Sequence, residues 1–385
     1  MTAVALLTPP GMGAIATVAV RGSAAWSIAH RLFQRMNGQP LPEHPQAGQF
    51  WYGRVGGERG DEVVLAVRRV EPEVWTEYHC HGGKLVTAWL LKMLQEANCS
   101  EIGWSQFLAV TDATEKDPGA LPFLVEARTL RTASILLDQY QGAYRRVVRE
   151  ALTALQQNDI PRAQTILTEL LRYADIGLHL TRPWHIAIAG APNAGKSSLI
   201  NALAGYQRSV VAPIPGTTRD VVTTTVAFDG WPVELSDTAG LRVAADTLEQ
   251  AGIARARQAL AEADLCLWLI DITGEMPPAR EEFAAENGLP VERIFPVLNK
   301  IDQPPAWDNL RFKDAVRIAA LHGTGIDELI RRFMQRLVPD DVPPGAAVPY
   351  SPEQIRYLQQ ALAALAGGEI ETATTYLAAS ISTVG

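Results

Sequence analysis

The chain has few cysteines and no long apolar run, and both absences limit what it can be. Its 385 residues include three cysteines, Cys80, Cys99 and Cys266, in no paired spacing, which argues against a secreted disulfide framework and favours a reducing compartment. The longest apolar runs, such as 265–270, are far too short to span a bilayer. The first 20 residues lack the basic segment that opens a signal peptide. We therefore expect a cytoplasmic protein that has no membrane partner.

An excess of basic residues is also missing. The chain has 34 lysines and arginines against 42 aspartates and glutamates, a net charge of −8. This balance excludes a chain-wide positive field for gripping nucleic acid, although a local basic patch remains compatible with it. The length, with 47 % hydrophobic residues, predicts two or three folded domains.

The apolar pattern of the first part of the chain predicts a small α+β domain over residues 1–113. Its expected elements are strands at 3–7 and 14–20, helices at 24–36 and 85–97, and a hairpin of 49–55 with 62–69.

The rest of the chain changes character twice. Residues 114–182 have a helical period, over 121–158 and 160–173, and no strand signal, so they predict the first part of a helical domain. Residues 183–341 alternate strands and helices, which implies a parallel sheet with crossover helices. Residues 342–385 begin with a proline-rich linker and return to helix at 353–381. This order predicts an α/β domain inserted into a helical domain whose two parts meet in space.

The strongest motif is Gly190-Ala-Pro-Asn-Ala-Gly-Lys196-Ser197, between a strand expected at 184–189 and a helix expected at 198–204. Its glycines allow backbone N–H groups to converge on phosphates, and the following helix adds the positive end of its dipole. Lys196 supplies positive charge at the β- and γ-phosphates, and the Ser197 hydroxyl reaches Mg²⁺. The motif predicts a nucleotide-binding P-loop whose further contacts come from Asn193, Ala194, Gly195 and Ser198. A chance glycine-rich turn is the alternative, and Lys-Ser in register after a buried strand argues against it.

Two further segments fit the phosphate and metal side of such a site. Asp237-Thr-Ala-Gly240 follows an apolar strand, so that Asp237 can hold Mg²⁺ through water while the Gly240 amide approaches the γ-phosphate. By itself this motif would be weak evidence for a nucleotide site, because an aspartate at a strand end is often a turn residue. The threonine-rich stretch 215–220 predicts a first switch in which Thr218 closes onto Mg²⁺. Its alternative is a polar surface loop.

Asn299-Lys300-Ile301-Asp302 selects the base. The Asp302 carboxylate can accept hydrogen bonds from N1–H and the 2-amino group of guanine, whereas adenine has no donors there. The aliphatic stem of Lys300 is expected to lie on the base plane. The backbone of Ala320 and Leu321 is expected to complete the pocket. The motif therefore predicts GTP and GDP as the nucleotides.

Hydrolysis needs a group that orients the attacking water. Many GTPases carry glutamine directly after Asp-x-x-Gly, and this chain has Leu241, which has no hydrogen-bonding group. Glu249, on a helix expected at 247–260, is the carboxylate that we predict in that role, and its alternative is a solvated helix-face glutamate. The side-chain oxygen of Asn193 can coordinate a monovalent cation beside the phosphates. The alternative for Asn193 is a turn residue chosen for its backbone.

These motifs together resemble the G domain of the MnmE (TrmE) family of tRNA modification GTPases. They read Gly-x-Pro-Asn-x-Gly-Lys-Ser-Ser-Leu, Gly-Thr-Thr-Arg-Asp, Asp-Thr-Ala-Gly-Leu-Arg and Asn-Lys-x-Asp. Residues 8–15, Asp61-Glu-Val-Val and His79-Cys-His-Gly-Gly83 resemble landmarks of the family's N-terminal domain. A metal site at His79-Cys80-His81 is disfavoured, because adjacent strand residues face opposite ways and no second Cys/His pair follows. A glycine-rich turn before the helix at 85–97 is favoured.

The resemblance implies a GTPase that forms a homodimer through its N-terminal domain. In that family the G domains meet in the presence of K⁺ and GTP, and a flavoprotein partner shares in modifying the wobble uridine of certain tRNAs. A folate one-carbon donor binds the N-terminal domain. The resemblance also implies that K⁺ sits by Asn193 and that Glu249 positions the water.

Two departures from the family leave open which process GTP hydrolysis serves in this protein. The family's Cys-x-Gly-Lys tail has no counterpart, because the chain ends Ser-Ile-Ser-Thr-Val-Gly385 with no cysteine after Cys266. Residues 113–121 lack the Gly-Glu-Phe-type segment that contributes to the family's folate site. One interpretation is a GTPase that takes part in wobble uridine modification. The other is a GTP-dependent switch or assembly factor that keeps the scaffold and has lost that chemistry.

Overall fold

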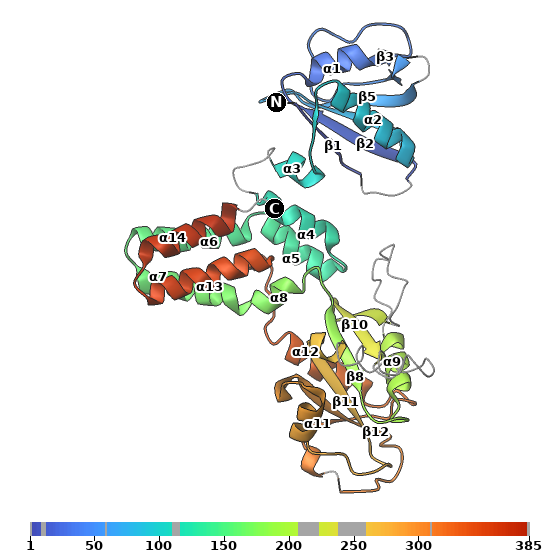
Figure 1. Cartoon of the computed structure of the whole chain (residues 1–385), viewed down its shortest axis with the longest axis vertical. Helices are drawn as coiled ribbons and strands as arrows, with labels where there is room; N and C mark the ends of the chain where they lie inside the picture. Colours follow the sequence, from blue (N-terminus) through green and yellow to red (C-terminus); the bar gives the residue numbers. More distant parts are fainter. Residues whose placement is uncertain are drawn as a thin grey trace. The chain divides into compact units, whose positions relative to one another are not determined.

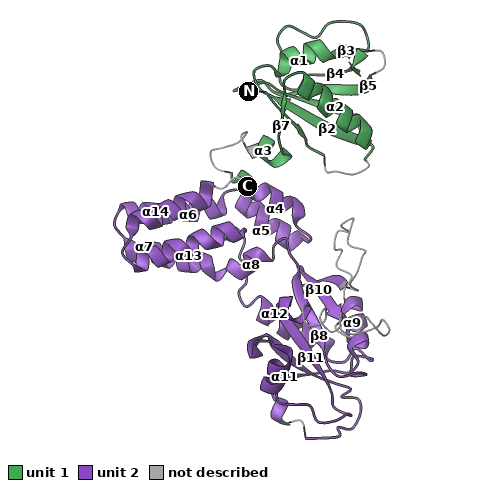
Figure 2. Cartoon of the chain, in the orientation of Figure 1, with its two compact units in different colours: residues 1–119, 384–385 green, residues 120–383 purple. Residues whose placement is uncertain are grey.

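The chain divides into two compact units, Met1–Gly119 and Ala120–Thr383 (Figure 2). The computed structural model describes residues 2–8, 13–57, 60–109, 116–206, 223–237, 259–308 and 310–382. No helix among these residues is long and apolar enough to cross a membrane.

The first unit is built on a seven-stranded sheet in the order β3-β4-β5-β6-β2-β1-β7. Neighbours are antiparallel except β1 and β7, which are parallel. The strands are β1 (Ala3–Leu6), β2 (Ile15–Arg21), β3 (Phe33–Arg35), β4 (Phe50–Val55), β5 (Asp61–Arg69), β6 (Trp75–His81) and β7 (Ser100–Glu101); the helices are α1 (Ala25–Leu32), α2 (Lys84–Glu96) and α3 (Trp104–Ala109).

Alternation along β5 explains why helices cover one face of this sheet. Val63, Leu65 and Val67 are buried while the residues between them are only partly buried, and they join α1 and α2 in one apolar cluster. On the opposite face Phe107 of α3 packs against Ala5 and Ala19. The α+β prediction for this region is confirmed.

The helix predicted at 24–36 is wrong at its C-terminal end. Helix α1 ends at Leu32, and Phe33–Arg35 pair with β4 as an edge strand. The apolar period continues through Phe33, but the backbone groups of β4 are available to pair with, and this tertiary contact outweighs helix propensity.

The second unit combines a helical bundle with an inserted α/β domain. Helix α14 packs along α6, and α13 packs along α7, although about 200 residues separate the members of each pair (Figure 1). The inserted architecture is therefore confirmed. The bundle consists of α4 (Leu121–Glu126), α5 (Leu130–Tyr140), α6 (Ala143–Gln156), α7 (Ile160–Arg172), α8 (Ala174–Leu178), α13 (Pro352–Ala366) and α14 (Ile370–Ser382).

The inserted domain has a six-stranded sheet in the order β13-β12-β11-β8-β10-β9. Its strands are parallel except for the β9–β10 hairpin, so the prediction of a parallel sheet fails only at this edge. Asp229 and Gly230 make the hairpin turn with φ of 48° and 76°, the left-handed values that a tight two-residue turn needs. The elements are β8 (Trp184–Ala189), α9 (Lys196–Gly205), β9 (Thr223–Phe228), β10 (Trp231–Asp237), β11 (Leu265–Asp271), α11 (Arg280–Asn287), β12 (Ile294–Asn299), β13 (Val316–Arg317) and α12 (Ile326–Leu337).

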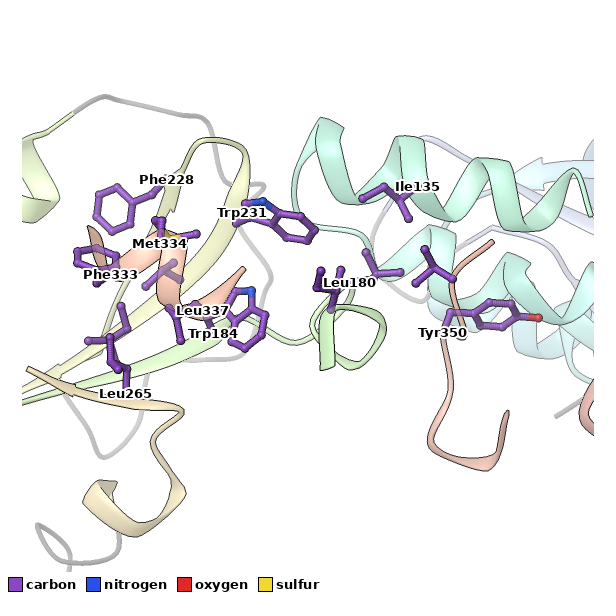
Figure 3. Packing of buried hydrophobic residues seen from close by; sticks show 14 of the residues in the cluster. Ile135, Leu180, Trp184, Phe228, Trp231, Leu265, Phe333, Met334, Leu337 and Tyr350 are labelled. Atoms are coloured by element: carbon purple, nitrogen blue, oxygen red, sulfur yellow. The ribbon is translucent and has the colours of Figure 1, made fainter. Parts of the chain in front are cut away.

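One continuous apolar core joins the bundle to the inserted domain (Figure 3). Ile135 of α5 and Leu180 belong to the bundle side, and Trp231 of β10 belongs to the sheet side. Phe228 meets Phe333 of α12 edge to face, with ring centroids 5.4 Å apart. The end of the β9–β10 hairpin is thus part of the packing between the bundle and the sheet.

Candidate functional site

The loop between β8 and α9 has the backbone that a phosphate site needs. Strand β8 is buried along nearly its whole length, as a central parallel strand is. Asn193 and Gly195 are both left-handed, with φ of 62° and 98°. A Cβ on Gly195 would lie 2.4 Å from Nδ2 of Asn299, so only glycine fits there. Gly195 caps α9, and the first N–H groups of a helix, which make no bond within it, favour an anion.

Lys196 places its charge inside this loop. The side chain is buried, and Nζ donates to the carbonyl oxygens of Gly190 at 3.0 Å and Ala191 at 2.8 Å. Both carbonyls belong to the loop itself, so the ammonium group lies within the turn that the motif forms. That position suits an ammonium group that binds phosphate oxygens.

Ser197 and Asp237 bring two oxygen ligands together. Strands β8 and β10 are parallel, and their register sets Asp237 opposite Ile188, at the end from which the P-loop leaves. The Ser197 hydroxyl donates to Oδ2 of Asp237 at 3.4 Å. A hydroxyl and a carboxylate oxygen are donors that Mg²⁺ prefers, so this pair fits the predicted metal.

Asn299 ties the phosphate loop to the base-pocket segment. Its side chain is buried; Nδ2 donates to the Ala194 carbonyl at 2.8 Å, and Oδ1 accepts the Ala320 N–H at 3.0 Å. One side chain therefore satisfies a buried backbone group in each of two segments that the sequence assigns to the same nucleotide. We call this pair of hydrogen bonds the Asn299 strap.

The remaining base-pocket residues lie beside the Asn299 strap. Lys300 is left-handed, with φ of 65°, and Nζ lies 2.5 Å from Oδ2 of Asp271. Oδ2 of Asp302 lies 3.6 Å from Nε2 of His322. A neighbouring cavity of about 460 Å³ is lined by Ser198, Asn201, Ala202, Gly205, Tyr206, Ala320, Leu321, Gly323 and Ile326. Three predicted nucleotide contacts, at positions 198, 320 and 321, thus share one cavity.

Three predicted residues lie outside the described part of the chain. They are Thr218 of the first switch, the Gly240 amide and the water-positioning Glu249. Their roles stay predictions.

Asp271 and His322 lie beside these residues and were not predicted from the sequence. Asp271 ends the apolar strand β11, as Asp237 ends β10, and an acidic residue at the carboxyl end of a parallel strand was the available signal. His322 directly follows the predicted pocket backbone and carries no signal of its own.

The His79-Cys80-His81 segment belongs to strand β6, and the turn begins only at Gly82. Cys80 is buried in the cluster under the helices, while His79 on the other face bonds the Thr17 hydroxyl at 3.0 Å. His81 pairs with Asp61 at 2.8 Å. Within the described ranges, no group of three His, Cys, Asp or Glu residues is arranged to hold a metal ion. The strand geometry used against a metal site is thus observed, because these three residues complete the ladder with β2, and the predicted glycine-rich segment before the helix is Gly82-Gly83, directly ahead of α2.

Comparison with known proteins assigns both parts of the chain. Residues 2–104 match the family model "GTP-binding protein TrmE N-terminus", and residues 185–300 match "50S ribosome-binding GTPase". The tRNA modification GTPase MnmE of Moorella thermoacetica is 32 % identical, with 87 % of this chain and 81 % of the relative covered. The chain belongs to the MnmE family.

Two further MnmE proteins are similar to this chain to the same extent. The MnmE proteins of Geobacter sulfurreducens and Thermus thermophilus are 32 % and 31 % identical, with 88 % and 87 % of this chain and 81 % and 82 % of the relatives covered. Among solved structures, a variant of Era from Aquifex aeolicus is 29 % identical, with 47 % of this chain and 66 % of that chain covered and a TM-score of 0.32.

As a member of the MnmE family, the protein is a GTPase that hydrolyses GTP to GDP and phosphate. Similarity to MnmE proteins extends over both the N-terminal domain and the inserted domain. This favours the first interpretation of the sequence over a switch or assembly factor that has only kept the scaffold.

Proposed function

We propose that this GTPase takes part in modifying the wobble uridine of tRNAs. The observation that carries the proposal is the combination of a formed P-loop with a TrmE-type N-terminal domain in one chain. The relatives that share this combination over most of their length are named tRNA modification GTPases. The proposal assigns GTP hydrolysis to the same process in this protein.

Deletion of the gene, followed by mass spectrometry of tRNA nucleosides, tests the proposal. We expect the modified wobble uridine to disappear and to return with the wild-type gene. Lys196→Ala, which removes the cation inside the P-loop, should fail to restore it. Arg331→Gln, which changes an exposed pair with Glu328, should restore it fully. Modification that is unchanged by the deletion would contradict the proposal.

In the proposed nucleotide complex, the residues of the loop bind and orient the phosphates. Lys196 and the N–H groups at the start of α9 donate hydrogen bonds to the phosphate oxygens. Ser197, Asp237 and Thr218 would hold Mg²⁺, which would supply positive charge to the phosphates. The Gly240 amide is proposed to donate to the γ-phosphate. The distance between Ser197 and Asp237 supports the assignment of this pair.

The base is recognised by hydrogen bonds that adenine cannot make. In the proposal Asp302 accepts from N1–H and the 2-amino group, and the stem of Lys300 covers the ring plane. The backbone of Ala320 and Leu321 completes the pocket. Asn299 fixes this backbone relative to the phosphate loop, so the base and the phosphates are positioned by one framework.

Glu249 positions the attacking water in this proposal, because Leu241 stands where glutamine is common. Glu249→Ala should leave nucleotide affinity close to that of the wild type. Turnover should fall by about 100-fold or more, as expected when a general base or water-orienting group is lost. An unaffected rate would assign the role to another carboxylate.

K⁺ beside Asn193 is the proposed charge stabiliser of hydrolysis. The left-handed φ of 62° gives an asparagine a backbone reason to be there, so the side chain needs its own test. Asn193→Gly keeps the turn and removes the amide. We expect K⁺ to accelerate turnover over Na⁺ in the wild type and to have no such effect in Asn193→Gly. Equal wild-type rates in both salts would refute the cation role.

The proposal includes a homodimer formed through the first unit. Phe50 and Tyr52 of β4 are 71 % and 51 % exposed, which is unusual for neighbouring aromatics on one face of a sheet and supports a covering partner. Phe50→Arg should shift the sedimentation of the full chain from dimer to monomer; unchanged sedimentation would exclude this face.

The flavoprotein and tRNA partners, the folate one-carbon donor and a cytoplasmic location complete the proposal. All three cysteines are buried and free, which fits a reducing cytoplasm. Isothermal titration with a reduced folate tests the donor directly, and co-sedimentation with tRNA tests the nucleic-acid partner. No heat of binding would remove folate from the proposal.

A further inference from the structure

Asp271 lies next to the base-recognition motif without belonging to it. Strands β11 and β12 are parallel neighbours, and their register pairs Asp271 with Asn299, the first residue of the motif. The Ile272 N–H also donates to the Asn299 carbonyl at 3.3 Å. The end of β11 is thus joined by backbone bonds to the segment that carries Lys300 and Asp302.

The Asp271 carboxylate is held in place by its own loop. Oδ1 accepts the Thr273 N–H at 2.9 Å and the Thr273 hydroxyl at 2.7 Å. Burial acts to raise the pKa of Asp271, but the hydrogen bonds from Lys300 and Thr273 outweigh it and leave the pKa below its ordinary value. The group is therefore ionised at neutral pH and has one oxygen, Oδ2, directed to another partner.

That partner is the ammonium group of Lys300, 2.5 Å from Oδ2. Lys300 is also fixed at its other end, because its backbone is left-handed and its carbonyl accepts the Gln303 N–H at 3.0 Å. A lysine side chain that is free at its tip loses much rotamer freedom when a ligand packs against its stem. With both ends held, the stem is already ordered before a base arrives.

We propose that Asp271 is a positioning residue for the guanine base: it anchors the Lys300 ammonium so that the lysine stem forms a fixed wall of the pocket. This inference rests on the base pocket proposed above. A plain surface ion pair between Asp271 and Lys300 would contribute little to stability and nothing to nucleotide affinity. The proposed role instead predicts an effect on nucleotide affinity.

A double-mutant cycle on the affinity of the full chain for fluorescent GDP tests this role. Asp271→Asn keeps the size of the side chain and an oxygen for Thr273 but removes the charge facing Lys300. Lys300→Met keeps an unbranched apolar stem and removes the ammonium. We expect Asp271→Asn to raise the Kd for GDP about 10-fold in the wild type, the effect of releasing one lysine side chain. In the Lys300→Met background the same change should have no effect.

The controls separate binding from stability and from the pocket itself. Asp314→Asn breaks an exposed ion pair with Arg280 in the same domain and should leave the Kd unchanged. Thermal unfolding of each variant reports loss of fold separately. An equal effect of Asp271→Asn in both backgrounds, or no effect in either, would overturn the positioning role. Failure of the pocket itself would show differently, as an unchanged GDP affinity in Asp302→Asn.

Discussion

At the scale of single residues, the site depends on side chains that hold backbone segments together. Asn299 is the clearest case, because it bonds the Ala194 carbonyl and the Ala320 N–H from a buried position. Neither segment contains enough secondary structure to satisfy these groups by itself. The Asn299 strap therefore contributes to stability and to nucleotide binding at once.

Asn299→Ala should destabilise the protein by about 2–4 kcal/mol, since two buried backbone groups lose their partners. Urea unfolding measures the loss, and GDP affinity should fall with it. Asn287→Ala is the matched control, because Asn287 makes a single bond to the Phe283 carbonyl on α11. An equal and small effect of both changes would contradict the role of the Asn299 strap.

Some of these residue contacts could be read from the sequence and others could not. The Lys196 and Asp302 motifs have fixed spacing because phosphate and base geometry is fixed, so they are visible in one chain. The pairing of Asp271 with Lys300 depends on the register of β11 against β12, which no local pattern specifies. Thr218 and Glu249 stay predictions.

At the scale of elements, the β9–β10 hairpin connects the site to the helical bundle. Its strand β10 ends at Asp237, and its turn is held by Arg131 of α5, which bonds Asp229 at 2.7 Å and Asp341 at 2.6 Å. The guanidinium also lies over the Trp231 ring, 5.1 Å from the centroid. The Thr129 hydroxyl, which caps α5, donates to the Gly230 carbonyl at 2.6 Å.

Arg131→Ala should lower the free energy of unfolding by about 1–2 kcal/mol through loss of the ring contact and the two ion pairs. Arg172→Ala provides the control, because Arg172 pairs with Asp340 from a more exposed position and its loss should shift the unfolding temperature less. Thermal unfolding measures both. Equal shifts would mean that the hairpin is not specifically anchored.

Asp264 makes the stability of the contact between the inserted domain and the end of the bundle near His179 depend on pH. It accepts from the His185 N–H at 2.8 Å and pairs with His179, which stacks on Trp184. Burial acts to raise the pKa of Asp264, but the His179 and His185 hydrogen bonds outweigh it and lower the pKa. A lowered folded-state pKa gives stability above the unfolded value of about 3.9, and this stability is lost as the pH falls through the folded value.

Asp264→Asn should therefore destabilise the protein at pH 7 and have a shrinking effect as the pH falls below about 4. Chemical denaturation of the wild type and the variant across that range measures the difference. A difference that is constant with pH would show that ionised Asp264 does not contribute.

Elements bounded by clear breaker residues were predictable, and some other strands were not. Strand β8 matches its predicted range because its six residues, all apolar except His185, are bounded by Pro183 and Gly190. A helix was predicted over the short edge strand β3, whose pairing with β4 decides its conformation, and no strand was predicted over β6, which pairs with β2 and β5.

At the scale of the whole molecule, the insertion connects GTP hydrolysis to the bundle. The inserted domain leaves the bundle after α8 and returns before α13, and the two parts of the bundle pack as pairs of helices. This order was predictable because the strand-helix alternation starts and stops between two helical regions. The shared core between Trp231 and Ile135 was not, since both are apolar residues with no local indication of partner.

The central claim is that this inserted domain binds and hydrolyses GTP through the Asp302 pocket. Asp302→Asn tests it most directly, because an amide donates where the carboxylate accepted, which suits the 2-carbonyl of xanthine instead of the 2-amino group of guanine. We expect GTP affinity to fall by about 100-fold or more, with binding and hydrolysis of xanthosine triphosphate gained. Unaltered GTP affinity, with no gain for xanthosine triphosphate, would contradict the claim.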